Sequence, residues 1–278
     1  MPVEPKNHQR HNHLVPRPPQ KKTRRNIAAW TISAIAVAGA AGAIAWMIWP
    51  PGSRLKTSIK STPSSSTNAA TTGLRPTNAT GVAAFFAALS NRTDVAELMN
   101  GGTALLANGQ NREAIACYRR VLELKPEDEE AHYNLGLAHA RNGQMGLAEH
   151  HYREALRIFP EYPEAHNNLG NVLTRAKRYA EAVEEFQTAL KLQPDYPIAH
   201  NNWGRALAEQ GDPAAAIPHF LEAVRLDTNY FEAHFNLGNS YLNLGRTNEA
   251  VVHFNTVLRI RPDFAPAVQA LSRLRTLR

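Results

Sequence analysis

Asparagine recurs at one fixed spacing along most of this chain, inside segments whose pattern predicts helix. The column consists of Asn100, Asn134, Asn168, Asn202 and Asn236, each 34 residues after the one before. Asparagine inside a helix costs roughly 0.5 kcal/mol relative to alanine, so its recurrence indicates a role that offsets this cost. Because the side-chain amide both donates and accepts hydrogen bonds, such a column can hold the main chain of a peptide of any sequence. The alternative is a purely structural role within the fold.

Histidine shows the same spacing, which raises the question of a metal site. The residues concerned are His132, His166, His200 and His234. Equivalent points on neighbouring packed helices lie about 10 Å apart, whereas zinc requires every ligand at about 2.1 Å. The four histidines therefore cannot form one metal site. We interpret them as residues at the edge of the core that are hydrogen-bonded to their neighbours.

Motifs for catalysis or cofactor binding are missing from the sequence. The single cysteine, Cys117, excludes an intramolecular disulfide, and its place beside Tyr118 in a predicted helix favours a packing role. No glycine-rich phosphate-binding loop and no nucleophile elbow is found. The sequence therefore predicts neither an enzyme nor a bound cofactor or metal.

The elements that must position the two columns follow from the 34-residue period, which continues over five units without a gap. The units span residues 95–128, 129–162, 163–196, 197–230 and 231–264. Within each unit, positions 4, 7, 8 and 11 share one helix face, and positions 20, 24, 27 and 28 share the face of a second helix. Position 8 is always glycine, position 20 always alanine and position 24 always tyrosine or phenylalanine. Each unit is therefore predicted to be a helical hairpin in which a ring fills the space left by two small residues.

Proline completes the pattern at position 32 in four of the five units, where it ends the second helix. The fourth unit has Thr228 there and carries Pro218 inside its second helix, where we expect a bend. Small, aromatic and proline positions in such a gapless array are similar to those of the tetratricopeptide repeat family, over 170 of 278 residues. The resemblance implies an all-α fold, a right-handed superhelical solenoid of five hairpins with capping helices.

In that family the first helices of the hairpins line the concave surface. The asparagine column then resembles the repeat arm of the O-linked N-acetylglucosamine transferases, in which such asparagines hold the backbone of an extended peptide. Because hydrogen bonds of about 1 kcal/mol each give such a column only modest affinity, side chains at positions 5, 9 and 13 would have to supply selectivity. These are Met99, Tyr133, Phe235, Arg141, Arg175 and Arg205. We expect no transferase activity, because only a short capping helix is predicted after the repeats.

Composition divides the rest of the chain into segments. Residues 1–94 carry 12 lysines and arginines and 2 acids, a net charge of +10, whereas residues 95–278 carry 19 and 22, a net charge of −3. The basic excess thus lies outside the repeats, which argues against nucleic-acid binding. We predict, in chain order, a basic disordered tail, a membrane anchor, a Ser/Thr/Pro-rich linker, an N-terminal capping segment and, after the repeats, a C-terminal capping helix. Their ranges are 1–26, 27–49, 50–81, 82–94 and 265–278.

The membrane prediction depends on the uncharged residues 27–49. As a helix this run of 23 residues would be about 34 Å long, enough to cross a bilayer core of about 30 Å. Because lysine and arginine are denser before it than after it, we expect a single-pass protein with a cytoplasmic N-terminus and extracytoplasmic repeats, periplasmic in a bacterium. Cleavage by a signal peptidase and a twin-arginine signal at Arg24-Arg25 are alternatives. The small-residue run at 39–43 could join two spans into a homodimer.

Together these features predict a membrane-anchored scaffold or adaptor that binds an extended segment of a partner protein in its concave groove, in a chaperone or complex-assembly role. One alternative is an architectural protein whose array and span self-associate. Another is the non-catalytic recruiting subunit of a transferase or biogenesis complex. All three are compatible with a repeat scaffold, because one fold serves many functions.

Overall fold

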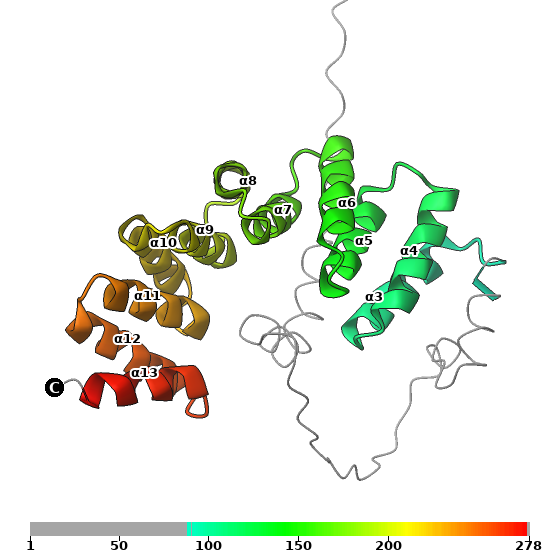
Figure 1. Ribbon diagram of the computed structural model, residues 1–278. Helices are drawn as coiled ribbons and strands as arrows, with labels where there is room; N and C mark the ends of the chain where they lie inside the picture. The colour runs from blue at the N-terminus through cyan, green and yellow to red at the C-terminus, as the bar shows by residue number, and fades with distance from the viewer. Residues whose placement is uncertain (1–87, 90, 277–278) are drawn as a thin grey trace, which may run out of the picture. The chain divides into compact units, whose positions relative to one another are not determined.

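The computed structural model describes residues 88–89 and 91–276, and this part of the chain consists of helices and turns without a β-strand. Its helices, in chain order, are α3 (Val95–Ala107), α4 (Asn111–Leu124), α5 (Glu129–Arg141), α6 (Met145–Ile158), α7 (Pro163–Arg175), α8 (Tyr179–Leu192), α9 (Pro197–Gln210), α10 (Pro213–Leu226), α11 (Phe231–Asn243), α12 (Thr247–Ile260) and α13 (Ala265–Thr276). Figure 1 shows these helices following one another in hairpins from α3 to α13.

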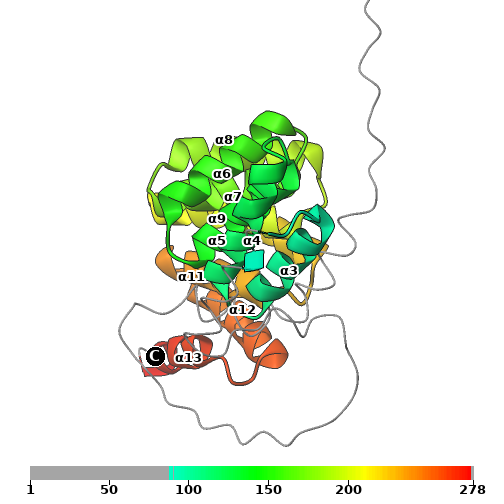
Figure 2. The same cartoon turned by 90° about the vertical axis from the view of Figure 1, so that its right-hand side faces the viewer.

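Each hairpin consists of the two helices of one 34-residue unit, which we call repeats 1 to 5. The helix pairs α3/α4, α5/α6, α7/α8, α9/α10 and α11/α12 pack within a repeat. The second helix of each repeat also packs on the first helix that follows, and the last of these is α13. Figure 2 looks at the same stack from the end at α3 and α4. The predicted all-α solenoid of helical hairpins is therefore confirmed.

The inside of each hairpin is built on one close contact, between the glycine at position 8 and the ring at position 24. A Cβ atom added to Gly170 would lie 2.7 Å from Cε1 of Phe186, which is closer than real Cβ contacts come. The same ring contact, at 2.7 Å, is found at Gly102, Gly136, Gly204 and Gly238. All five rings are buried to within 1% exposure. The predicted fit between a bulky ring and a residue without a side chain is thus confirmed in every repeat.

The turn inside each hairpin has a requirement that the sequence analysis overlooked. Position 15 has a left-handed backbone in every repeat, and it is glycine in four of them: Gly109, Gly143, Gly211 and Gly245. Lys177 occupies this position in repeat 3 with a φ of 61°. Because a side chain is disfavoured in this conformation, glycine at position 15 is explained by the turn itself.

Both ends of the array carry apolar residues that cover the core. Leu89 is buried against the first hairpin, and α13 buries Ala267, Leu271 and Leu274. Helix α10 continues through Pro218 from Pro213 to Leu226. At the start of α7 and α9, Pro163 and Pro197 occupy the first turn, where a missing N–H group breaks no helical bond.

The predicted localisation requires a correction. In the part of the chain that the structure describes, no helix is long and apolar enough to cross a membrane. Its longest helices have 14 residues and measure about 21 Å, less than the bilayer core of about 30 Å. The single-pass arrangement, with a cytoplasmic N-terminus and extracytoplasmic repeats, is therefore not supported by any helix found. The predicted anchor at residues 27–49, and the homodimer contact within it, lie outside the described residues, as do the predicted tail and linker.

Candidate functional site

The asparagine column lies on the first helices, α3, α5, α7, α9 and α11, but its members differ in exposure. Asn100 is exposed, and Asn168 and Asn236 are half-buried. Asn134 and Asn202 are buried, with exposed fractions of 7% and 3%. The column is therefore continuous along the array, while the access of a ligand to it changes from repeat to repeat.

Hydrogen bonds between successive repeats fix the orientation of three of these asparagines. Nδ2 of Asn202 donates to Oδ1 of Asn167 at 2.9 Å, and Nδ2 of Asn236 donates to Oδ1 of Asn201 at 2.9 Å. Nδ2 of Asn168 donates to the hydroxyl of Tyr133 at 3.1 Å. In each case position 6 of one repeat bonds to position 5 of the repeat before it. We call this series the amide ladder.

We call the contact between two neighbouring repeats a joint. The joint between repeats 1 and 2 has no hydrogen bond of this kind among the described residues, because position 5 of repeat 1 is Met99, whose thioether is only a weak acceptor. The partners of the ladder were not singled out as a set by the sequence analysis. The doublets Asn167-Asn168 and Asn201-Asn202 were nevertheless visible in the sequence. A rule that pairs position 5 with position 6 one repeat later would have found them.

The aromatic residues predicted for the groove are largely used in packing. Tyr133 lies 4.7 Å from Tyr162 between ring centroids, and burial raises the pKa of its hydroxyl. Phe235 contacts Phe254 at 5.7 Å and Phe264 at 5.1 Å between centroids. Both rings are packed against core residues, so they contribute more to the stability of the fold than mobile contact groups would.

The predicted arginines differ in what they contact. Nη1 of Arg141 donates to the carbonyl of Leu106, one repeat earlier, at 3.0 Å. Nη2 of Arg205 donates to Oδ1 of Asn171 at 2.6 Å, and burial lowers the pKa of its guanidinium. Arg175 is exposed. Arg141 and Arg205 thus link repeats to each other, which the sequence analysis did not anticipate.

The histidines at position 4 are bonded to neighbours, as predicted. Nε2 of His132, His166 and His234 lies 3.0–3.3 Å from the carbonyl oxygen at position 32 of the repeat before it. Their Nδ1 atoms face position 23 of the second helix. Nδ1 of His132 is 3.2 Å from that of His151, and Nδ1 of His234 is 3.1 Å from that of His253. These three histidines therefore tie their hairpins together and to the preceding turn, whereas Nδ1 of His200 is buried without a hydrogen-bond partner among the described residues.

The arrangement of these repeats matches a known family. Sequence models described as tetratricopeptide repeat match residues 99–163, 161–229 and 207–274. Residues 99–274 belong to the tetratricopeptide repeat family. The family resemblance on which the fold prediction depended is thereby confirmed, while the finer likeness of the asparagine column to one transferase arm is not shown by these matches. No curated protein matches the chain.

Several solved structures are similar to this tetratricopeptide repeat array. YrrB, described as a TPR protein with an unusual peptide-binding site, is 25% identical with a TM-score of 0.53, over 68% of this chain and 98% of YrrB. Pseudomonas aeruginosa pilF is 23% identical with a TM-score of 0.60, over 66% of this chain and 83% of pilF. MamA from Desulfovibrio magneticus RS-1 is 24% identical with a TM-score of 0.55, over 62% of this chain and 98% of MamA. The last two likenesses show the fold alone.

Proposed function

We propose that the tetratricopeptide repeats bind an extended segment of a partner protein along the surface of their first helices, and that the protein acts as a scaffold or adaptor in complex assembly. The fold is one that serves protein interaction, and YrrB, the structure at 25% identity, is described as having a peptide-binding site. In this proposal the chain acts by binding and has no catalytic step of its own.

The amide ladder is the observation that carries this proposal. Each ladder asparagine uses one N–H in the bond to the preceding repeat. The amide of each residue has a second N–H and an oxygen besides the N–H used in this bond, and these are the groups that would meet a peptide backbone. Because the inter-repeat bond already fixes the amide, a peptide backbone would meet groups that need little further ordering.

The spacing of the column fits an extended ligand. Successive first helices are expected about 10 Å apart, and an extended peptide advances about 3.3 Å per residue. One asparagine would therefore meet about every third residue of the ligand. At about 1 kcal/mol net for each hydrogen bond the ladder alone gives modest affinity. Side chains that remain accessible, such as Arg175 and the half-buried Tyr133, would have to supply selectivity.

Burial of Asn134 and Asn202 supports a second candidate function. Both side chains are less than 8% exposed, so the ladder could serve only to hold successive repeats in register. The array would then be architectural and its first-helix surface would not bind a peptide. A third candidate, a recruiting subunit for a separate catalytic chain, uses the same surface as the first and differs only in the partner.

Photo-crosslinking in cells separates these candidates. A crosslinkable residue is placed in the full chain at Asn100 or at Asn236, with an exposed second-helix position, Arg225, as the control. We expect a discrete partner from the first two positions and not from the third. Adducts of the chain with itself alone would favour the architectural candidate, and the same mixture from all three positions would contradict specific binding.

The partner, once captured, allows a direct test of the ladder. Replacing Asn236 by Ala should weaken binding of the captured segment in solution, while Asn248, on the second helix of the same repeat, serves as the control for substitution. An unchanged affinity together with a lowered unfolding midpoint would show that Asn236 is structural. If the captured partner is an enzyme whose activity depends on the groove, the recruiting role is favoured.

A further inference from the structure

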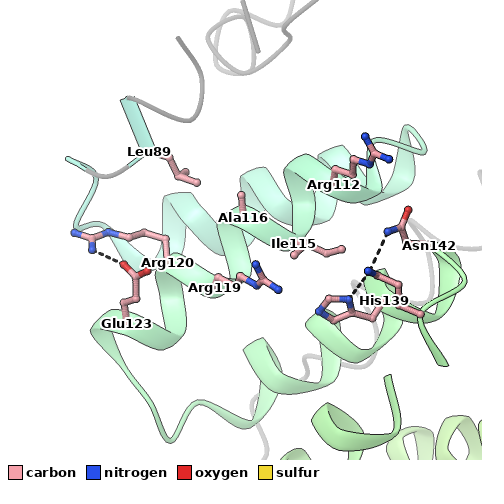
Figure 3. Close-up of a pocket in the computed structure, with 10 residues that line it drawn as sticks. Leu89, Arg112, Ile115, Ala116, Arg119, Arg120, Glu123, His139 and Asn142 are labelled. Atoms are coloured by element: carbon pink, nitrogen blue, oxygen red, sulfur yellow. Dashed lines mark hydrogen bonds and ion pairs between the residues drawn. The ribbon is translucent and has the colours of Figure 1, made fainter. Parts of the chain in front are cut away.

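A pocket of about 500 Å³ lies beside α4, the second helix of repeat 1, and reaches the turn between α5 and α6. It is lined by apolar side chains, among them Ile115, and by Arg112, Arg119 and His139. Figure 3 shows Arg119 and His139 turned toward each other across this pocket. None of its lining residues belongs to the asparagine column or to the side chains predicted for the peptide groove.

Two of the three arginines that line this pocket form no ion pair with a carboxylate among the described residues. Arg120 donates to Glu123 at 2.7 Å, but Arg112 and Arg119 are exposed and take part in no ion pair within residues 88–89 and 91–276. The pKa of His139 is lowered, mainly by burial. The hydrogen bond to Gln144 acts in the opposite direction, and the positive charge of Arg119 lowers the pKa further. The pocket is therefore a region of positive potential.

The next joint of the array is an internal control for this feature. Arg153, the counterpart of Arg119 one repeat later, lies 3.0 Å from Glu149 and 3.5 Å from Glu181. These two glutamates correspond to Ile115 and Leu147 at the first joint. The same cationic position is thus neutralised at one joint, whereas at the other no carboxylate among the described residues pairs with it.

His139 adds a buried acceptor to the pocket. The residue is 1% exposed, and its Nδ1 lies 2.8 Å from Oε1 of Gln144, which also accepts a hydrogen bond from Asn142 at 3.0 Å. Because this oxygen is an acceptor, Nδ1 must carry the proton, which leaves a lone pair on Nε2. Nε2 is buried and has no hydrogen-bond partner among the described residues. An unpaired buried acceptor is costly, so Nε2 of His139 is available to accept a hydrogen bond from a ligand that reaches it.

We propose that this pocket binds a phosphate group, held by Arg112 and Arg119 and hydrogen-bonded to Nε2 of His139. Two guanidinium groups bind an oxyanion through charge-assisted hydrogen bonds. The lone pair of His139 accepts a hydrogen bond, so the ligand must also carry a proton. A phosphate monoester meets both requirements, because its second pKa of about 6 leaves part of it singly protonated near neutral pH. Sulfate and carboxylate carry no such proton.

Binding requires both arginine side chains to move, because Figure 3 shows the guanidinium of Arg112 turned away from His139. The exposed Arg119 points its guanidinium toward the imidazole in Figure 3, and its long side chain can follow the phosphate outward. The P–OH group then donates to Nε2, while the charged oxygens stay with the two arginines. The phosphate could belong to a phosphorylated residue of a partner or to a small phosphorylated molecule, and both present the same group.

Calorimetric titration of the full chain at pH 6.5 tests the site. The probes are inorganic phosphate, sulfate, a short peptide with one phosphoserine and the same peptide with unmodified serine. We expect phosphate to bind more tightly than sulfate. Tighter binding of the phosphopeptide than of free phosphate would identify a protein segment as the source, and equal or weaker binding would identify a small molecule. Absence of saturable phosphate binding by the wild type would overturn the proposal.

Two substitutions with matched controls distinguish the site from general attraction of anions. Arg119→Gln should weaken phosphate binding by about tenfold or more, whereas Arg153→Gln, at the equivalent ion-paired position, should leave it unchanged. His139→Leu introduces the residue found at the equivalent positions 173 and 207, so the fold should persist. The His139→Leu variant should no longer bind phosphate more tightly than sulfate. Equal losses in Arg119→Gln and Arg153→Gln, or an undiminished preference in His139→Leu, would contradict the proposal.

Discussion

The interior of each hairpin and the joints between hairpins follow different rules. Inside, glycine at position 8 meets a ring at the same 2.7 Å in all five repeats. At the joints the contacts change: the ladder acceptor is Tyr133 at one joint and asparagine at the next two, and Met99 provides none at the first. A close-packed interior tolerates few alternatives. The joints are partly open to solvent, so they can vary, and both proposed binding surfaces lie there.

Loss of an interior ring should have the largest effect. Phe186→Ala removes a completely buried ring from repeat 3 and should lower the free energy of unfolding by about 3–5 kcal/mol. Urea denaturation followed by circular dichroism measures the change. The control is Val252→Ala, whose side chain is 61% exposed, and it should stay within about 0.5 kcal/mol. A small loss of unfolding free energy for Phe186→Ala would contradict the view that the hairpin interior tolerates fewer substitutions than the joints.

The second largest loss of stability is expected on acidification, through the histidines that join the two helices of a hairpin. Burial, followed by the facing histidine, lowers the pKa to about 4 for His151, His219 and His253. In the unfolded chain the pKa of each returns to 6.5, so between pH 6.5 and 4 the unfolded state binds more protons. Stability that is fully present above pH 6.5 is therefore lost as the pH falls through this window. We expect about 1 kcal/mol for each histidine after allowance for partial exposure.

Repeat 3 provides the control for this pH dependence. There Glu185 replaces the second histidine, and its Oε2 lies 2.6 Å from Nδ1 of His166. His253→Glu should give repeat 5 the same pair, because His234 occupies the place of His166. Urea denaturation at pH 7.5 and pH 4.5 should then show a smaller difference than in the wild type. An identical difference would show that the histidine pairs do not cause the acid sensitivity.

A ladder asparagine should have a moderate effect. Asn202→Ala leaves Oδ1 of the buried Asn167 without its donor and should lower the free energy of unfolding by about 1–3 kcal/mol. Asn100→Ala, at the exposed end of the same column, should change it by no more than about 0.5 kcal/mol. Thermal unfolding of both variants measures the contrast, and equal effects would show that the ladder adds no stability to the joints.

The smallest effect is expected at the turn of repeat 3. Lys177 has a left-handed backbone at a position that is glycine in the other repeats. Lys177→Gly should therefore raise the free energy of unfolding by about 1 kcal/mol, since a side chain is disfavoured in this conformation. The reverse exchange, Gly211→Lys, should lower it by a similar amount. A destabilising effect of Lys177→Gly in the same assay would mean that its side-chain contacts outweigh the strain.

Much of the fold could be predicted because its determinants lie within one repeat. The spacing of apolar residues predicts each helix, and the glycine, alanine and ring positions predict how the two helices of a hairpin pack. The candidate site was less predictable. The asparagine column was found, but the packing of Phe235 in the core and the inter-repeat bonds of Arg141 and Arg205 were not. The two arginine bonds join residues of different repeats, and the contact of Phe235 with Phe264 joins two distant positions of one repeat. Periodicity within a single helix describes neither kind of contact.

The sequence by itself determined the period, the hairpins and the close contact inside each of them, because local spacing and side-chain size leave one way to pack two short helices. Only the tertiary structure decided how one hairpin lies on the next. That placement brings Asn202 to Asn167 and Arg141 to the carbonyl of Leu106, and it buries Nε2 of His139 where no donor of the described residues reaches it. The offset between hairpins sets these contacts, and it depends on the packing of two helix surfaces together rather than on the pattern of either one.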